Sequence, residues 1–305
     1  MEEAKKQQPK KTDDSTVRNI IKGLKRKKAR DNEGWNNEVL IDGGEEIVRS
    51  LVKMTDLVQE EMEIPKPWNH MTIKSTHKKA EKEILTNKRG LFLTNVVSKS
   101  FEKVVDTNNE VKFDILQNSG TINRRTVDNW IILGAIMDEG KRLKKPVYLF
   151  FADLVKCFDR LWLKDCVNDL NSCGMREREA GLIYKLNEDA SFKVSTPAGL
   201  TKESRVKEIV KQGTVYGPKL CCASTGKINE GIDVEEVIYP SVSVKAMTFV
   251  DDIFGGGGYE FVEEVMKKCS ENEDEKMWEF FISSLRSRSG CVKAMGRKML
   301  VKRLM

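Results

Sequence analysis

Three aspartates in the sequence stand at the ends of apolar stretches that are typical of buried strands. Asp153 ends the stretch "VYLFFAD", and the adjacent Asp251 and Asp252 interrupt the apolar run "AMTFVDDIF". Neighbouring strands of a sheet lie about 4.8 Å apart, so carboxylates at two strand ends can reach a shared cation. Without a cation they would repel one another, and one carboxyl group would keep its proton. The pattern therefore predicts a site in which carboxylates bind divalent cations.

Clustered carboxylates of this kind are suited to phosphoryl transfer. Two divalent cations about 3.5–4 Å apart can hold the attacking and the leaving oxygen of an in-line displacement. Mg²⁺ prefers carboxylate oxygens and keeps several waters, so the residue types favour two Mg²⁺ ions, with Mn²⁺ as a substitute. Adjacent aspartates also occur in many exposed turns, and the metal-binding hypothesis therefore depends on the surrounding sequence.

The surrounding sequence predicts helices and strands that would hold these carboxylates. Apolar residues at helical spacing predict helices over 45–62, 126–143 and 176–190. The segment 147–152 is almost wholly apolar and rich in β-formers, which indicates a strand covered on both faces. A second strand over 244–250 would lead into the turn that carries the adjacent aspartates. This mixture of elements indicates an α+β protein.

Length and composition fit one large domain or two ordinary ones, since the chain has 305 residues of which 39% are apolar and 33% charged. No run of about 18 apolar residues occurs and the charged N-terminus lacks an apolar stretch, so we expect neither a membrane span nor a secretion signal. Seven cysteines form no CxxC pair and only two histidines are present, which disfavours a zinc site and indicates a reducing compartment. We therefore expect an intracellular protein of the nucleus or cytoplasm, without a membrane partner.

The positive charge is concentrated at the N-terminus. Residues 1–30 hold eleven Lys/Arg and four Asp/Glu, a net charge of +7, whereas the whole chain carries +6. The simplest interpretation is a solvated, disordered tail. The run "KGLKRKKAR" at 22–30 also fits a nucleic-acid-binding patch or a nuclear-import signal.

Five stretches, in their order along the chain, match the motifs of one polymerase family. They are "LTNKRGLFLTNVVSKSFEKVV" (85–105), "ILQNSGTINRRTVDNWIIL" (115–133), "FADLVKCFD" (151–159), "KQGTVYGP" (211–218) and "FVDD" (249–252). Together they resemble the fingers and palm of reverse transcriptases, specifically those of non-LTR (LINE-type) retrotransposons, over residues 23–268. The sequence departs from the family at three places. Cys157 stands where an alanine is usual, the usual phenylalanine is either replaced by Ile122 or absent, and "FVDD" stands where Y-A-D-D is usual.

The resemblance implies an α+β fold, with a right-hand polymerase palm in which an antiparallel sheet packs on helices. It also implies fingers, and a thumb that is largely absent. The implied segments are a basic disordered tail at 1–22, N-terminal helices and fingers at 23–145, the palm with its carboxylates at 146–275, and a divergent C-terminal segment at 276–305.

The resemblance also gives the aspartates their roles. Asp153, Asp251 and Asp252 match the positions of the catalytic carboxylates that bind the metal ions. Asp153 and Asp251 would bind both ions, and Asp252 would be engaged less directly. Asp159 lies six residues after Asp153, and we interpret it as a polar contact or cap within the helix that follows.

Four further positions match the family's nucleotide-binding residues. Arg89 matches the fingers arginine, whose planar guanidinium suits the oxygens of a triphosphate. Phe158 matches the aromatic residue that excludes a ribose 2′-hydroxyl, although a core aromatic is the alternative. Gln212 and Gly213 match the motif that packs near nucleotide and template, where glycine permits close approach of the backbone. The candidates for a second basic contact are Lys74, Lys78 and Lys79.

The tryptophans have a separate interpretation. Trp68, Trp130 and Trp162 are expected to be core residues. Trp35 is expected in the core as well, with a stacking platform for a base as the alternative.

We therefore predict an RNA-directed DNA polymerase. Its partners would be an RNA template, a DNA primer and deoxynucleoside triphosphates, and it would add nucleotides to the DNA 3′-hydroxyl with release of pyrophosphate. The alternative is a catalytically inactive, decayed copy of such an element that at most binds nucleic acid. A two-metal nuclease is disfavoured, because a nuclease needs neither the triphosphate contact at Arg89 nor the sugar-selecting ring at Phe158.

Overall fold

The structure is a computed structural model of the 305-residue chain. It describes residues 2–77, 88–113, 117, 119, 125–144, 147–153, 157–231, 236–239, 242–244, 247–250, 252–257, 291–293 and 300–304. The chain forms two compact units: unit 1 comprises Met1–Val111 and Phe158–Leu220, and unit 2 comprises Lys112–Cys157 and Cys221–Met305. Each unit is thus built from two separate stretches, whereas the sequence suggested consecutive segments.

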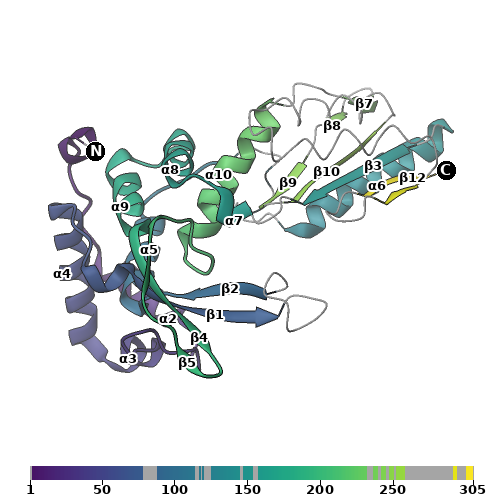
Figure 1. Cartoon of the computed structure of the whole chain (residues 1–305). Coiled ribbons are helices and arrows are strands. Elements are labelled where there is room, and N and C mark those ends of the chain that lie inside the picture. The colour runs from purple at the N-terminus through teal and green to yellow at the C-terminus, as the bar shows by residue number, and fades with distance from the viewer. Residues whose placement is uncertain are drawn as a thin grey trace. The chain divides into compact units, whose positions relative to one another are not determined.

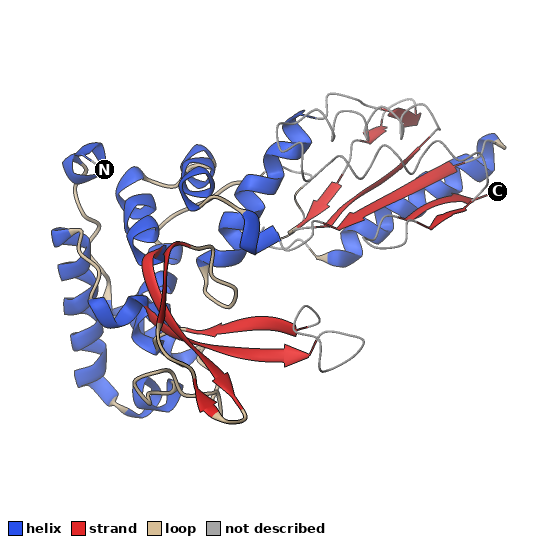
Figure 2. Cartoon of the chain, in the orientation of Figure 1, coloured by secondary structure: helices blue, strands red, loops and turns tan. Residues whose placement is uncertain are grey.

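Unit 1 is rich in helices (Figures 1 and 2). They are α1 (Glu2–Lys6), α2 (Asp14–Lys22), α3 (Asn37–Asp42), α4 (Gly44–Glu61), the 3-10 helix η1 (Lys66–Asn69), α5 (Val96–Thr107), α8 (Leu163–Ser172) and α9 (Glu177–Asn187). Along the chain, α7 (Cys157–Arg160) and α10 (Tyr216–Gly231) each continue from one unit into the other. The predicted helices over 45–62 and 176–190 are confirmed as α4 and α9.

The N-terminal residues are helical and packed, which differs from the disordered tail that we expected at 1–22. Val17 and Ile21 of α2 are one helical turn apart and are buried against Leu40 of α3 and Val48 of α4. The burial of this apolar face stabilises a helix that its own polar sequence would not hold in water.

Arg178 of α9 also fixes the N-terminal segment. Its buried guanidinium donates hydrogen bonds to the backbone oxygens of Gln59 and Glu60, each at 2.9 Å, and to the backbone oxygen of Gln7 at 2.8 Å. Further bonds reach the backbone oxygens of Ala4 and Lys5. One arginine thereby satisfies carbonyl groups near the C-terminal ends of α1 and α4, which have no partner within their helices.

Unit 1 also contains a five-stranded mixed sheet. Its strands are β1 (His70–His77), β2 (Lys88–Leu93), β4 (Glu188–Thr196), β5 (Gly199–Leu200) and β6 (Ser204–Glu208). The order is β2-β1-β4-β5, with β6 also paired to β4. The β1–β4 pair is parallel and the other pairs are antiparallel. Met71, Phe92 and Ala190 form its buried apolar cluster.

Unit 2 contains an antiparallel sheet that packs on a helix, which confirms the α+β class and the sheet-on-helix arrangement expected of the palm. The strands, in the order β11-β12-β3-β10-β9, are β11 (Cys291–Lys293), β12 (Leu300–Leu304), β3 (Val147–Asp153), β10 (Asp252–Gly257) and β9 (Met247–Phe249). Helix α6 (Thr126–Leu143) covers the sheet with Leu133 and Ile136, which contact Val147 and Leu149. A separate pair, β7 (Glu236–Tyr239) and β8 (Val242–Val244), completes the described strands.

A glycine in the run after the aspartates leaves room for a side chain of the neighbouring strand β3. A Cβ atom added to Gly256 of β10 would lie 2.3 Å from Cδ2 of Leu149 and 3.5 Å from Cγ2 of Ile136. The first distance is well inside van der Waals contact, so a side chain at this position would force the side chain of Leu149 to move. The glycine therefore belongs to the packing of the sheet that carries the aspartates.

The tryptophan predictions were only partly correct. Trp68 is buried and packs against Phe101, with ring centroids 5.2 Å apart. Trp130 and Trp162 are 64% and 70% exposed, so their assignment to the core was wrong. Trp130 is exposed because α6 is apolar on two sides and buries the side opposite this residue. Trp162 lies at the N-cap position of α8, outside the helix's buried face. Trp35 is also largely exposed.

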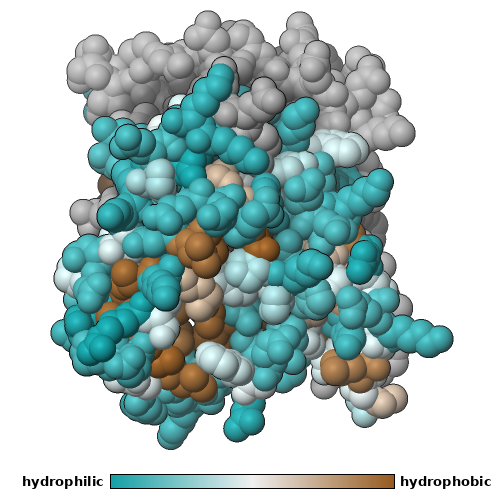
Figure 3. Space-filling model, turned by 90° about the vertical axis from the view of Figure 1, so that its left-hand side faces the viewer, coloured by the Kyte–Doolittle hydropathy of each residue, from teal (hydrophilic) through white to brown (hydrophobic). Residues whose placement is uncertain are grey.

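Figure 3 shows a mainly hydrophilic face on which apolar side chains occur in separate patches. None of the helices in the described part of the chain combines the length and the apolar character needed to cross a membrane.

Candidate active site

The sheet of unit 2 brings two of the three predicted carboxylate positions together. Asp252 at the start of β10 is the cross-strand partner of Asp153 at the end of β3. On its other side, Asp252 pairs with Phe249 of β9. Cross-strand partners in an antiparallel sheet have Cα atoms about 4.5–5.5 Å apart. Asp252 is exposed, whereas Asp251 and the side chain of Asp153 lie outside the described residues.

The residue types at this sheet end are ones that Mg²⁺ accepts as ligands. Paired strand ends place acidic residues side by side, and carboxylate oxygens are ligands that Mg²⁺ accepts. Among the side chains that the structure describes, no three potential ligands form a cluster. The predicted site would need Asp251 and the side chain of Asp153, so that finding does not bear on it.

Strand β2 of unit 1 carries or contacts three of the four predicted nucleotide-binding residues. Arg89 lies on β2, opposite Thr76 of β1. Further along β2, the N–H of Phe92 donates a hydrogen bond of 3.2 Å to the backbone oxygen of Gln212. Gly213 has φ +101°, and a Cβ atom there would lie 3.1 Å from the backbone oxygen of Phe92. Glycine is therefore required both for the backbone conformation and for the close contact with β2.

The remaining predicted residues lie in different places. Phe158 is half-buried in α7, where Asp159 is exposed. Lys74 is exposed on β1, opposite Leu91. Lys78 and Lys79 lie outside the described residues.

A buried pair of charges, which sequence reasoning missed, holds the loop that carries Gln212 and Gly213. Glu102 of α5 accepts hydrogen bonds through Oε2 from the N–H groups of Val215 at 2.8 Å and Tyr216 at 3.0 Å, at the start of α10. A carboxylate is favourable at this position, because the first N–H groups of a helix have no partner within it and carry partial positive charge.

The opposite charge is on Lys211, which is fully buried, donates its hydrogen bond to the backbone oxygen of Leu186 and attracts Glu102 without forming an ion pair with it. Burial raises the pKa of Glu102 to about 6, although Lys211 and the two N–H groups act against that rise. Burial also lowers the pKa of Lys211 to about 8, and Glu102 opposes this change. Each charge thus makes the burial of the other tolerable, and the loop is anchored at both of its ends. Two charged residues next to the quoted motifs could have pointed to this arrangement. They are Lys211, which directly precedes Gln212, and Glu102, which lies in the predicted helix after Arg89.

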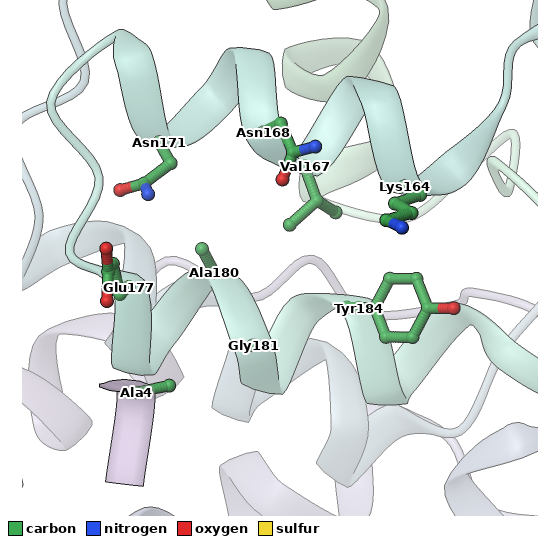
Figure 4. Close-up of a pocket in the computed structure, with 9 residues that line it drawn as sticks. All are labelled: Ala4, Lys164, Val167, Asn168, Asn171, Glu177, Ala180, Gly181 and Tyr184. Atoms are coloured by element: carbon green, nitrogen blue, oxygen red, sulfur yellow. The ribbon is translucent and has the colours of Figure 1, made fainter. Parts of the chain in front are cut away.

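A pocket of about 370 Å³ in unit 1 lies elsewhere, between α8 and α9 (Figure 4). Val167 and Ala180 face it near the middle, Lys164 and Tyr184 lie at one end, and Asn171 lies at the other. None of the predicted metal- or nucleotide-binding residues lines it, and we assign it no part in the chemistry.

Two comparisons with known proteins found a match. A family model described as "Reverse transcriptase (RNA-dependent DNA polymerase)" matches residues 76–271. Among solved structures, the chain is similar to the apo telomerase from Candida tropicalis truncated from its C-terminal domain, with a TM-score of 0.49 and 13% sequence identity. The match covers 77% of this chain and 54% of that one, so the chain spans about half the length of that relative. No curated protein matches the sequence.

Proposed function

Because this chain belongs to the reverse transcriptase (RNA-dependent DNA polymerase) family, whose model matches residues 76–271, we propose that it synthesises DNA on an RNA template as part of a non-LTR retrotransposon. The observation that carries the proposal is the pairing of Asp252 with Asp153 at one end of the antiparallel sheet, within the matched region. The non-LTR type is supported by "FADLVKCFD" and by the two stretches at 85–105 and 115–133 that precede it.

In this proposal Asp153, Asp251 and Asp252 hold Mg²⁺. When bound, Mg²⁺ favours attack by the primer 3′-hydroxyl and neutralises charge on the departing pyrophosphate. Arg89 binds the triphosphate through its planar guanidinium. The loop with Gln212 and Gly213 lies close to β2, the strand that carries Arg89, and would pack near the nucleotide.

Incorporation of a single nucleotide tests this function. The full chain is given an RNA template with an annealed DNA primer, Mg²⁺ and one deoxynucleoside triphosphate at a time. We expect the primer to grow by one residue only with the triphosphate that is complementary to the next template base. Addition that ignores the template base would indicate a terminal transferase instead.

Substitution of Phe158 by valine is expected to relax sugar selection. A smaller side chain would no longer exclude the 2′-hydroxyl, so the ratio of deoxynucleotide to ribonucleotide incorporation should fall by about tenfold or more, the scale on which one steric contact discriminates substrates. Incorporation of the two nucleotides is compared in single-turnover reactions. Phe158→Tyr keeps the ring and should keep the ratio. An unchanged ratio of deoxynucleotide to ribonucleotide incorporation in Phe158→Val would show that the ring has a structural role only.

The exposed basic segment at 22–30 is proposed to bind the RNA backbone. Arg26 is paired with both carboxylate oxygens of Asp42, which ties the segment to α3. Lys25, Lys28 and Arg30 are exposed. These side chains are therefore candidates for contacts with phosphates, which release counterions and make binding salt-dependent.

Replacement of Lys25, Lys28 and Arg30 by glutamine is expected to weaken RNA binding and to reduce the slope of log K against log salt by about 2, at about 0.7 for each lost contact with single-stranded RNA. Substitution is preferable to deletion, because α2 belongs to the core of unit 1. The matched control replaces three exposed cations of unit 1 that lie elsewhere, namely Arg49, Lys53 and Lys66. Equal slopes for the two triple variants would exclude a specific role for the segment.

A further inference from the structure

Two buried polar side chains hold the turn that leads to the adjacent aspartates. The N–H of Val250 donates a hydrogen bond of 3.2 Å to Oε1 of Gln117. The backbone oxygen of Val250 accepts a hydrogen bond of 2.7 Å from Oγ1 of Thr225, in α10. Gln117 and Thr225 are both almost completely buried, and all three residues belong to unit 2. Both backbone polar groups of Val250 are therefore bound by side chains from distant parts of the sequence.

The two side chains are also bonded to each other. Nε2 of Gln117 donates to Oγ1 of Thr225 at 3.0 Å. Oγ1 of Thr225 further lies 2.9 Å from the backbone oxygen of Cys221, one turn earlier in α10. Gln117 is in addition bridged to Thr248 of β9. The result is a closed network that joins α10, the segment at Gln117 and the hairpin β9–β10.

The turn needs such a support. Val250 has φ +59°, in the left-handed region that a β-branched residue rarely adopts. Backbone strain of this kind persists only where the surrounding structure imposes it, and it is concentrated at functional sites. Val250 directly precedes Asp251 and Asp252, so its conformation decides the direction in which the chain carries these carboxylates.

We propose that Gln117 and Thr225 are positioning residues, which hold the backbone of Val250 and thereby place the carboxylates of Asp251 and Asp252 for cation binding. This inference rests on the proposed function, in which those carboxylates bind Mg²⁺. Gln117 and Thr225 act through the turn and not on the substrate. Without them Val250 relaxes toward a negative φ, and the carboxylates lose their alignment.

The test measures Mn²⁺ binding to the full chain without nucleic acid, by the electron paramagnetic resonance signal of free Mn²⁺, together with a thermal melt. Thr225→Val keeps the shape of the side chain without the hydroxyl, and Gln117→Met keeps its length without the amide. Both are expected to weaken the Mn²⁺ affinity by about 10–100-fold, as the loss of groups that orient metal ligands does. Thr225→Ser keeps the hydroxyl and should bind like the parent.

Two further variants make the outcomes distinct. Ile136→Val loosens the core under the same sheet without touching the turn, and it should leave the Mn²⁺ affinity unchanged. Asp251→Asn should lose the site. Equal Mn²⁺ binding by Asp251→Asn and the parent would overturn the carboxylate site and with it the proposed function. If Asp251→Asn loses the site while Thr225→Val and Gln117→Met bind like the parent, only the positioning role is overturned. A loss in Thr225→Ser or Ile136→Val equal to that in Thr225→Val would also overturn that role, because packing alone would then explain the effect.

Discussion

Asp153→Asn is expected to lower the rate of DNA synthesis by about a thousandfold or more, since the loss of a charged metal ligand costs several kcal/mol of transition-state stabilisation and each 1.36 kcal/mol is about tenfold. Asparagine keeps the shape of the side chain but removes the charge that would hold the cations. The backbone pairing with Asp252 does not involve the carboxylate, so the melting temperature should stay close to that of the parent.

The measurement is the initial rate of primer extension at saturating Mg²⁺, beside a thermal melt. Asp159→Asn is the matched control, because it removes the same charge from an exposed position in α7, six residues later. We expect that control to extend primers at a rate close to the parent's. An Asp153→Asn variant that is as fast as the parent would rule out the carboxylate assignment. An equal loss of extension rate in Asp153→Asn and Asp159→Asn would mean that the effect comes from the negative charge of the segment 153–159 and not from one metal-binding carboxylate.

Glu102→Gln is expected to lower the free energy of unfolding by about 1–3 kcal/mol, the range for a buried polar group that loses its compensation, because Lys211 is attracted to Glu102 without forming an ion pair with it. The amide oxygen of glutamine can still accept the hydrogen bonds from Val215 and Tyr216. The ammonium group of Lys211 would remain buried without its counter-charge. Loss of charge compensation, rather than loss of the helix cap, should therefore dominate the effect.

Urea unfolding of single and double variants measures this cost. Glu102→Gln combined with Lys211→Met removes both charges and should recover most of the lost stability. Asp106→Asn serves as the control, because Asp106 pairs with Lys219 in a partly exposed position, where such pairs contribute about 1 kcal/mol or less. A cost of Glu102→Gln no larger than that of Asp106→Asn would contradict the buried-pair account, as would a double variant that is less stable than the single one.

Much of the fold around the carboxylates could be predicted from the sequence. Periodicity predicted α6 with the bounds that the structure shows, and the apolar run before Asp153 predicted β3. Both elements can be recognised from their apolar residues. Those of α6 recur at helical spacing, because this helix packs on the sheet, and those of β3 are continuous, because this strand lies inside the sheet. Which side of α6 is buried could not be predicted, because apolar residues such as Trp130 lie on its exposed side as well.

Features that depend on distant contacts were not predictable. The helices at the N-terminus have polar sequences, and they are held by the apolar cluster around Val17 and by Arg178, which lies far along the chain. The contacts of Glu102 with the start of α10 and of Gln117 with Val250 each join residues more than a hundred positions apart. Such contacts between distant residues cannot be predicted from the pattern of neighbouring residues.

RNA-templated primer extension by the parent chain and by Asp251→Asn, side by side, tests the central claim most directly. Both proteins are given the same RNA template, a labelled DNA primer, all four deoxynucleoside triphosphates and Mg²⁺, and the products are sequenced. We predict that the parent lengthens the primer with DNA complementary to the RNA, releases one pyrophosphate for each added residue, and loses both activities on substitution of Asp251. Absence of extension by the parent with either Mg²⁺ or Mn²⁺, or equal extension by the variant, would contradict the assignment of this chain as an RNA-directed DNA polymerase with its site at the aspartate hairpin.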